Sequence, residues 1–360
     1  MRPDQGHASR RIGYACSYVP VEIITAAGML PYRIVPKPAP AEADAWIHPQ
    51  TCFFVKSLLA AALRGEWSQL SGLVLTNSCD AMSRLADLIR EYAGDLPVIF
   101  LDVPKKRDAD SIADFSSRLR NLASHLHEQY VDASGALSAD RLNEAIRRWN
   151  HVRRLMAEVF ALQLPGNPEA KASDIFRLSQ EGVQSDPLQF VDAVKRFLKR
   201  AGSGKSQGHG PRVVVTGNAI WDVAWIESIE NAGARVAVMH TCVGDRNYAA
   251  PVAEDTSDPL GALAARYLLK SPCARMMGIR ERIQHLRDHV TTYKADGVIC
   301  VAPKYCDFQL YEIPLLSESA GVPFLAFEND YRPDNEQMNA RLEAFLEMLV
   351  LGGDHAQERA

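Results

Sequence analysis

The strongest constraint on the fold is a pattern that occurs twice, a short apolar run that ends in Cys-Asp and leads into a helical pattern. The first copy reads LVLTNSCDAMSRL at residues 73–85, and the second reads VICVAPKYCDFQLYEI at residues 298–313. Both runs are nearly continuous, which is typical of strands buried on both faces of a parallel sheet. The flanking segments AAGMLPYRI and NAGARVAVM also correspond. The sequence therefore predicts two copies of one α/β unit.

The order of strands and helices sets the expected domain boundaries. Residues 1–107 and 211–360 are predicted to form two similar α/β lobes whose parallel sheets face a cleft. Between them, residues 108–200 carry Arg, Asp, Glu, Ala and Leu at helical spacing, with a break at LPGNP (164–168). The stretch AGSGKSQGHG at 201–210 is a flexible linker by composition. A single helix is expected over FQLYEIPLLSESAG (308–321).

The GSGKS segment of the linker suggests a phosphate-binding loop, but its context is wrong for one. That motif requires a further glycine upstream, where Lys199 stands, and it lies between a strand and a helix. Here a helical pattern precedes the segment and the strand VVVTG follows it. We therefore expect no nucleotide site in this chain.

Composition excludes several classes of function. The chain has 360 residues, a net charge of -4 and no apolar run of membrane-spanning length. The negative charge argues against binding to nucleic acid or to an anionic membrane. The N-terminal segment lacks the pattern of a cleaved signal peptide, so a cytoplasmic location is expected. In that reducing compartment, the seven cysteines are expected to be free thiols or metal ligands.

Three cysteines are predicted to follow strands at the carboxyl ends of the sheets. Cys16 lies in the turn after the first strand, and Cys79 and Cys306 occupy equivalent turns of the two repeats. Open parallel sheets bind ligands at this edge, and neighbouring helix N-termini stabilise thiolates. If the lobes face each other, three converging thiolates could hold an iron–sulfur cluster with one iron open to substrate or water.

Two other interpretations of these cysteines stay open on spacing alone. A free cysteine is often a small buried hydrophobic residue, and Cys300, in the middle of a predicted strand, is assigned to the core. Zinc is the competing metal, although its structural sites usually draw their ligands in close pairs.

Several motifs together resemble the 2-hydroxyacyl-CoA dehydratase and benzoyl-CoA reductase superfamily. They are GYACSYVPVEIITAAGMLPYRI (13–34), TNSCDAMSRL (76–85), HTCVGDRNY (240–248), SPCARM (271–276) and DGVICVAPKYCDFQLYEIP (296–314). Tyr305 stands where the family commonly has Phe. The resemblance spans nearly the whole chain. It implies two flavodoxin-like lobes with a [4Fe-4S] cluster held between them by Cys16, Cys79 and Cys306.

The resemblance also implies a reaction and its partners. In 2-hydroxyacyl-CoA dehydration, a low-potential electron makes a ketyl radical anion of the thioester, which expels the α-hydroxyl group. The electron comes from a separate ATP-hydrolysing iron–sulfur activator, and the catalytic part pairs two homologous subunits or two copies of one chain. Benzoyl-CoA reductases use the same device to reduce an aromatic thioester.

A second possibility within the same superfamily is a reductase or electron-storage protein without an acyl-CoA substrate. Some relatives are homodimers that carry an [8Fe-9S] double cubane bound by six cysteines. Cys52, Cys242 and Cys273 are the possible extra ligands here, because seven cysteines less the core residue Cys300 leave six. A third hypothesis, a two-lobed small-molecule binding protein, keeps all the cysteines as core.

Further residues are weaker candidates. Glu22 and His240 are the candidates for proton transfer, although a helix N-terminal position and local hydrogen bonds explain them as well. Lys56, Ser57 and Arg246 could contact coenzyme A or substrate. Asp80 and Asp307 are expected to cap the helices that follow Cys79 and Cys306.

Overall fold

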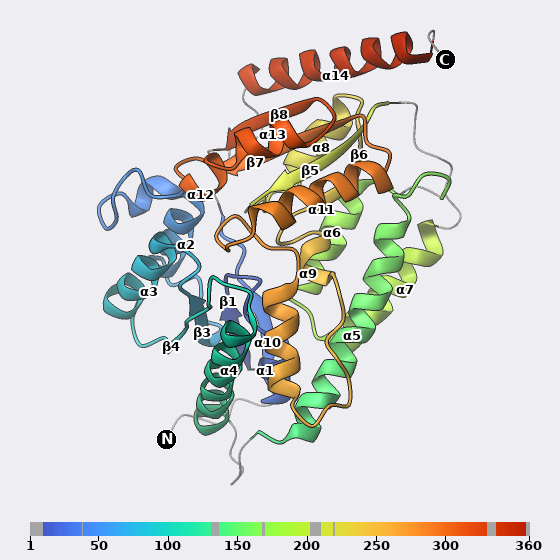
Figure 1. Cartoon of the computed structure of the whole chain (residues 1–360). Helices are drawn as coiled ribbons and strands as arrows, with labels where there is room; N and C mark the ends of the chain where they lie inside the picture. Colours follow the sequence, from blue (N-terminus) through green and yellow to red (C-terminus); the bar gives the residue numbers. More distant parts are fainter. Residues whose placement is uncertain are drawn as a thin grey trace.

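The computed structural model describes residues 10–37, 39–130, 137–167, 170–201, 210–218, 220–329 and 336–357. It confirms an α/β fold with two flavodoxin-like lobes, each built on a four-stranded parallel sheet (Figure 1). The first sheet has the order β2-β1-β3-β4 and the second the order β6-β5-β7-β8. The strands are β1 (Arg11–Tyr14), β2 (Leu30–Arg33), β3 (Leu70–Thr76), β4 (Val98–Leu101), β5 (Arg212–Gly217), β6 (Arg235–His240), β7 (Gly297–Pro303) and β8 (Phe324–Asn329).

The two sheets share one topology, since the first strand of each lobe lies second in the order and every pairing is parallel. In the first lobe the connections are α1 (Val21–Ala26), α2 (Phe53–Leu63) and α3 (Asp80–Tyr92), with a short 3-10 helix at Pro40–Ala43. Gly28, with φ of 75°, allows the chain to turn from α1 into β2. The nearly continuous apolar runs of the strands are explained by their burial between helices.

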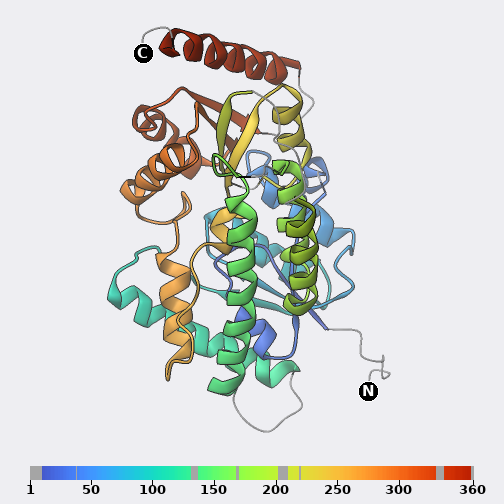
Figure 2. The same cartoon turned by 90° about the vertical axis from the view of Figure 1, so that its right-hand side faces the viewer.

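Four more helices follow the first sheet. They are α4 (Ala109–Tyr130), α5 (Ala139–Ala161), α6 (Ala172–Gly182) and α7 (Pro187–Ala201). They do not form a separate unit, because α4 packs against α10 and α5 packs against α1, α7, α9 and α10. Helix α5 therefore runs alongside both lobes (Figure 1, Figure 2). The predicted break at 164–168 falls between α5 and α6, and most of the predicted linker, including GSGKS, lies outside the described residues.

The second lobe carries more helices than the first. They are α8 (Ala224–Asn231), α9 (Asp245–Tyr248), α10 (Pro259–Leu269), α11 (Ile279–Thr292), α12 (Asp307–Leu310), α13 (Ile313–Ser319) and α14 (Glu336–Gln357). The prediction of one helix over 308–321 is wrong. Pro314 is near the start of α13, where its missing N–H costs nothing, whereas in the interior of a long helix it would break a hydrogen bond.

A main hydrophobic core extends through both lobes and the helices between them. A smaller cluster covers the other face of the second sheet, where Leu286 of α11 and Leu316 of α13 pack against Val214 and Val298. Helix α14 packs on the edge strand β8 at the top of Figure 1. Among the helices in the described part of the chain, none is both long and apolar enough to cross a membrane.

Gly217 lies at the carboxyl end of β5, where the two central strands of the second sheet approach closely. Its φ is 133°, and an added Cβ would overlap the carbonyl oxygen of Val301 in β7. Only glycine fits this position without displacing a strand. The close approach fixes the start of the loop that carries Asn218 toward the edge where the two lobes meet.

A buried ion pair joins the first lobe to the helices between the lobes. Glu22 of α1 is fully buried and pairs with Arg153 of α5. The Tyr267 hydroxyl of α10 donates to the other carboxylate oxygen at 2.8 Å. Burial alone would raise the pKa of Glu22, but the charges of Arg153 and Arg266 outweigh it and hold this pKa below its usual value. Three helices from different parts of the chain are therefore fixed by one carboxylate.

Replacing Arg153 with Met should lower the free energy of unfolding at pH 7 by about 3–5 kcal/mol, because Glu22 would stay buried without its partner. The folded-state pKa of Glu22 is lowered, so the ion pair contributes above the unfolded pKa of the carboxyl group. Its contribution is lost as pH falls through the folded pKa. The cost of Arg153→Met should therefore shrink in acid. Urea denaturation at several pH values measures it.

Arg147, on the exposed side of the same helix, provides the matched control. It pairs with Glu144 and Asp255 at the surface. Arg147→Met should change stability little, since surface pairs are screened by water. Equal losses in the two variants would contradict the role assigned to the buried pair.

Candidate functional site

The carboxyl ends of four strands each lead into a cysteine. Cys16 follows β1, Cys79 follows β3, Cys242 follows β6 and Cys306 follows β7. Because parallel strands all end at the same edge of their sheet, each lobe presents two of these thiols on one side. Cys273 comes from the loop between α10 and α11.

Three of the thiols stand at helix N-termini. Cys52, Cys79 and Cys306 are the N-cap residues of α2, α3 and α12. The partial positive charge of a helix N-terminus favours the thiolate form of such a cysteine, but burial outweighs it at two of them. Burial raises the pKa of Cys52 to about 11 and also raises the pKa of Cys306. The prediction that Asp80 and Asp307 cap these helices is wrong, because both are the first helical residues and neither helix has a side-chain cap. The cysteines occupy the capping positions themselves.

Six of the seven cysteines line two adjoining cavities. The first is small, about 50 Å³, and its cysteines are Cys16, Cys79, Cys242 and Cys273. The second, of about 590 Å³, is open to solvent and its cysteines are Cys52, Cys79 and Cys306. Cys79 lines both cavities. Cys16 and Cys306 thus each share a cavity with Cys79, but not the same cavity.

The seventh cysteine, Cys300, lies within β7 and lines neither cavity. It is fully buried, and burial raises the pKa of its thiol to about 12. The Gln309 side chain donates a weak hydrogen bond to its sulfur at 3.7 Å. Cys300 is therefore a core residue, as the sequence indicates.

Two arginines contact the thiols directly. Arg33 is almost completely buried and donates to the Cys242 carbonyl oxygen at 2.6 Å and to its Sγ at 3.4 Å. Arg275 donates from Nη2 to the Sγ of Cys306 at 3.4 Å, and its backbone N–H donates to the Sγ of Cys273 at 3.4 Å. Arg275 also lines both cavities.

Three more cations surround the cysteine loops and are held by backbone oxygens. Lys270 donates to the Ser17 carbonyl oxygen at 2.5 Å, and Lys105 donates to that of Asn77 at 2.6 Å. Arg246 donates to the carbonyl oxygen of Gly217 at 2.6 Å. Within the described ranges, no carboxylate forms an ion pair with any of the five cations: Arg33, Lys105, Arg246, Lys270 and Arg275.

The pKa values report the same electrostatic environment. Burial lowers the pKa of Lys270 well below its usual value, and the nearby thiols of Cys16 and Cys273, when ionised, oppose that shift. Burial would also lower the pKa of Arg275, but four nearby thiols, when ionised, raise it well above the ordinary value, those of Cys306, Cys79, Cys273 and Cys52. The first cavity, which Arg33 and Arg275 line and no carboxylate does, is therefore positively charged unless negative charge is present at the sulfurs.

His240 lies behind the thiols in a hydrogen-bond network. Its Nδ1 lies 3.0 and 3.1 Å from the two carboxylate oxygens of Asp245, and its Nε2 lies 3.0 Å from the Ser271 hydroxyl. His289 Nε2 contacts the same carboxylate at 2.7 Å. The network ties the loop of Cys242 to the loop of Cys273 and to α11.

Burial is the main cause that lowers the pKa of His240, to about 4, so the ring is neutral at pH 7. His240 lines neither cysteine cavity. The ligating atoms of His240, Asp245 and His289 lie within 4.8 Å of one another, the spacing of a metal site, and they form hydrogen bonds with one another. The ring is placed to hold the cysteine loops rather than to reach a ligand in the cavities.

The other predicted side chains lie away from the cavities. Glu22 is committed to Arg153, and Lys56 pairs with Asp44. Ser57 is completely buried on α2, and its hydroxyl has no hydrogen-bond partner among the described residues. Of the predicted substrate contacts, Arg246 lies nearest the thiols, because it also donates to the carbonyl oxygen of Pro272, next to Cys273, at 3.5 Å.

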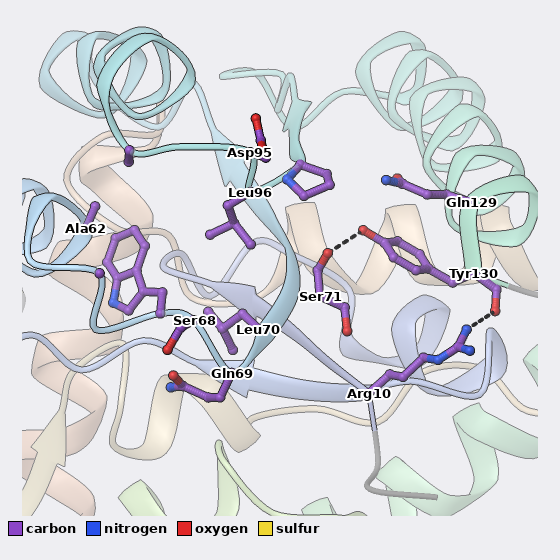
Figure 3. A pocket seen from close by; sticks show the side chains of 14 residues that line it. Arg10, Ala62, Ser68, Gln69, Leu70, Ser71, Asp95, Leu96, Gln129 and Tyr130 are labelled. Atoms are coloured by element: carbon purple, nitrogen blue, oxygen red, sulfur yellow. Dashed lines mark hydrogen bonds between the residues drawn. The ribbon is translucent and has the colours of Figure 1, made fainter. Parts of the chain in front are cut away.

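A larger cavity of about 850 Å³ lies at the opposite, amino end of the first sheet. Figure 3 shows that Arg10 reaches the Tyr130 carbonyl oxygen there, while the Tyr130 hydroxyl donates to Ser71. Its walls contain no cysteine or histidine. The cysteines that could bind a metal therefore line the two smaller cavities and not this one.

Four of the five cations around the thiols, all except Arg246, are the part of the site that sequence reasoning missed. Arg275 stands two residues after Cys273 in the segment SPCARM, where the cysteine alone suggests chemistry. Arg33 and Lys270 lie in apolar surroundings, where an unpaired charge is unusual. The sequence therefore did contain a signal for Arg33 and Lys270: each stands in a segment expected to be buried, with no acidic residue near it.

His289 provides a pH-dependent test of the network. Burial alone would lower its pKa, but Asp245 raises it above the ordinary value. The ion pair therefore contributes fully below the unfolded pKa, and its contribution is lost as pH rises through the folded pKa. His289→Gln should cost about 1.5–3 kcal/mol of stability near pH 6 and less at pH 9. Urea denaturation at both pH values measures this, with the exposed His125→Gln as control. A cost that grows with pH would contradict the assignment.

Comparison with known proteins places these features in a family. The chain is 24% identical over 353 residues to the (R)-phenyllactyl-CoA dehydratase beta subunit of Clostridium sporogenes, covering 94% of this chain and 92% of that protein. It is 26% identical to the putative dehydratase subunit YjiM of Escherichia coli, covering 94% and 91%.

A subunit of the benzoyl-CoA reductase of Thauera aromatica is 26% identical over 340 residues, covering 91% of this chain and 86% of that protein. All three relatives are named as subunits. A family model described as 2-hydroxyglutaryl-CoA dehydratase, D-component, matches residues 16–349, and the chain belongs to this family.

Proposed function

We propose that this chain is an iron–sulfur catalytic subunit of a 2-hydroxyacyl-CoA dehydratase-type enzyme. The observation that carries the proposal is the convergence of six thiols on two adjoining cavities. Thiolates are the usual protein ligands of iron–sulfur clusters. Cysteines that serve only as buried hydrophobic residues, as Cys300 does, would be scattered through the core. These six come from well-separated segments and still line two adjoining cavities.

The surroundings fit an anionic metal–thiolate group. Three of the cysteines stand at helix N-termini, and five cations without carboxylate partners lie around the sulfurs. A thiolate-bound cluster carries the negative charge that would compensate these cations. The donor set therefore suits iron–sulfur binding better than a closed zinc site, which needs only four ligands.

When bound, the group supplies one low-potential electron to a substrate thioester, as the family resemblance implies. The residues of this chain would hold that group and line the path by which a substrate reaches it. The exposed aromatic side chains of Trp46, Tyr305 and Phe308 form part of the wall of the second cavity. Its volume is within the range of about 300–1,000 Å³ that is usual for ligand pockets.

A complete enzyme would need partners. We propose a homologous sister subunit or a second copy of this chain, together with an ATP-hydrolysing iron–sulfur activator as the electron source. The naming of the relatives as subunits supports the first part.

Anaerobic purification provides the direct test. Protein with bound iron and acid-labile sulfide should change its visible spectrum when an acyl-CoA and a reduced activator are added. Dehydration of a 2-hydroxyacyl-CoA recycles the electron, whereas reduction of an aromatic thioester consumes it, so the electron stoichiometry separates these two activities. Iron-free protein that is otherwise native would contradict the proposal.

A specific observation favours a second candidate, a double-cubane reductase without an acyl-CoA substrate. The thiols divide into two groups joined at Cys79, with Cys16, Cys242 and Cys273 on one side and Cys52 and Cys306 on the other. Two oxidised cubanes, a bridging sulfide and six thiolates carry about four negative charges, whereas one cubane with three thiolates carries about one. The three arginines beside the thiols or their loops, Arg33, Arg246 and Arg275, match the larger charge more closely.

The entrance of the second cavity also bears on the substrate. It is lined by Asp80, Asp87 and Asp307 as well as by Arg84 and Arg275. A coenzyme A molecule carries several phosphate charges, and acidic residues at an entrance disfavour it. A small neutral or cationic substrate suits this entrance better, unless a partner subunit supplies the phosphate-binding cations.

Iron content of serine variants separates the two candidates. Cys273→Ser and Cys306→Ser should both lower the iron content of a chain that binds about eight irons, because one cysteine comes from each group. A single cubane would give about four irons per chain, and at least one of the two variants would then keep its full content. Cys300→Ala, in the core, is the control and should keep all its iron.

A further inference from the structure

Arg275 lies between the two sets of cysteines, those of the first cavity and those of the second. It lines both cysteine cavities, and the only other cysteine-loop residue to do so is Cys79. Its guanidinium donates to the Sγ of Cys306 on one side, while its backbone N–H donates to the Sγ of Cys273 on the other. One residue is thus in contact with both groups of thiols.

The side-chain partner of Arg275 is a sulfur, which is unusual for arginine. Its neighbour Arg282 shows the ordinary arrangement, since it binds both carboxylate oxygens of Glu312. In the described part of the chain, no carboxylate pairs with Arg275. Placing an unpaired cation in a partly buried position costs free energy, and negative charge at the sulfurs offsets that cost.

We propose that Arg275 is a positioning residue that raises the reduction potential of the group held by the six cysteines. This inference rests on the proposed iron–sulfur function. Each electron added to that group increases its negative charge, and a fixed cation at hydrogen-bonding distance from a ligand sulfur favours the more negative state. Hydrogen bonds to cluster sulfurs act in the same direction. The planar guanidinium also offers several donors, so one side chain can serve both thiol groups.

Two substitutions separate charge from shape. Arg275→Gln removes the cation and keeps a polar side chain, and Arg275→Lys keeps the cation but loses the fork of donors. In anaerobically purified holoprotein, a potentiometric titration followed by electron paramagnetic resonance should show a more negative potential for Arg275→Gln. Arg275→Lys should restore most of the difference. Iron content and circular dichroism are measured alongside.

Arg266→Gln is the matched control. Arg266 is a buried arginine that donates to the backbone carbonyl oxygens of Asn247, Ala249 and Ala250 rather than to sulfur. Its replacement should leave the potential close to that of the wild type. A shift as large as that of Arg275→Gln would show a general effect of buried charge and would overturn the specific role of Arg275.

The remaining outcomes are also decisive. An iron-loaded Arg275→Gln protein with an unchanged potential overturns the inference and leaves the proposed function intact. If Arg275→Gln folds but loses iron while Arg275→Lys keeps it, the potential of the Arg275→Lys holoprotein decides. A value close to that of the wild type supports the inference, and a much more negative value overturns it. Equal iron loss in both variants overturns the charge assignment. Wild-type protein without iron contradicts the proposed function and, with it, this inference.

Discussion

Positive charge without a carboxylate partner is the constraint on which the cysteine site depends. Five cationic side chains surround six thiols, and the described carboxylates that would ordinarily neutralise such cations pair elsewhere, as Glu22 does with Arg153 and Glu312 with Arg282. Leaving a cation buried and unpaired is costly. For Arg33, Lys105 and Lys270 the fold meets this cost with backbone carbonyl oxygens from the cysteine loops themselves. Cations and thiols are therefore held by the same segments, and neither can be arranged without the other.

The sequence predicts most of the architecture because parallel strands leave a strong local signal. Nearly continuous apolar runs followed by helical patterns identify strands such as β3 and β7, and the correspondence of the two halves indicates their common topology. The division of residues 307–319 into α12 and α13 was missed, because helical periodicity outweighed Pro314 in that segment. The packing of α4 and α5 across both lobes was also missed, since a pattern of apolar spacing shows which face is buried but not against what.

The candidate site was predictable in part. Strand ends and Cys-Asp pairs point to Cys16, Cys79 and Cys306, but spacing cannot show that Cys79 stands between two cavities or that Cys52 and Cys273 join them. The role of Glu22 illustrates the limit. A carboxylate close to a cysteine in sequence suggests proton transfer, whereas its environment depends on Arg153, which is more than a hundred residues away. Long-range pairing of charges is not encoded in any local pattern.

The distribution of the cysteines along the chain has a consequence for the order of folding. Cys16 belongs to the turn after the first strand and Cys306 to the turn after the seventh, so the two cavities exist only after both sheets have formed and docked. Contacts between such distant segments form slowly, because the loop between them must be closed first. A chain emerging from the ribosome therefore holds its thiols apart until synthesis is nearly complete. Loading of any metal group must be a late, post-translational event, and a folding intermediate offers at most scattered cysteines to an insertion machinery.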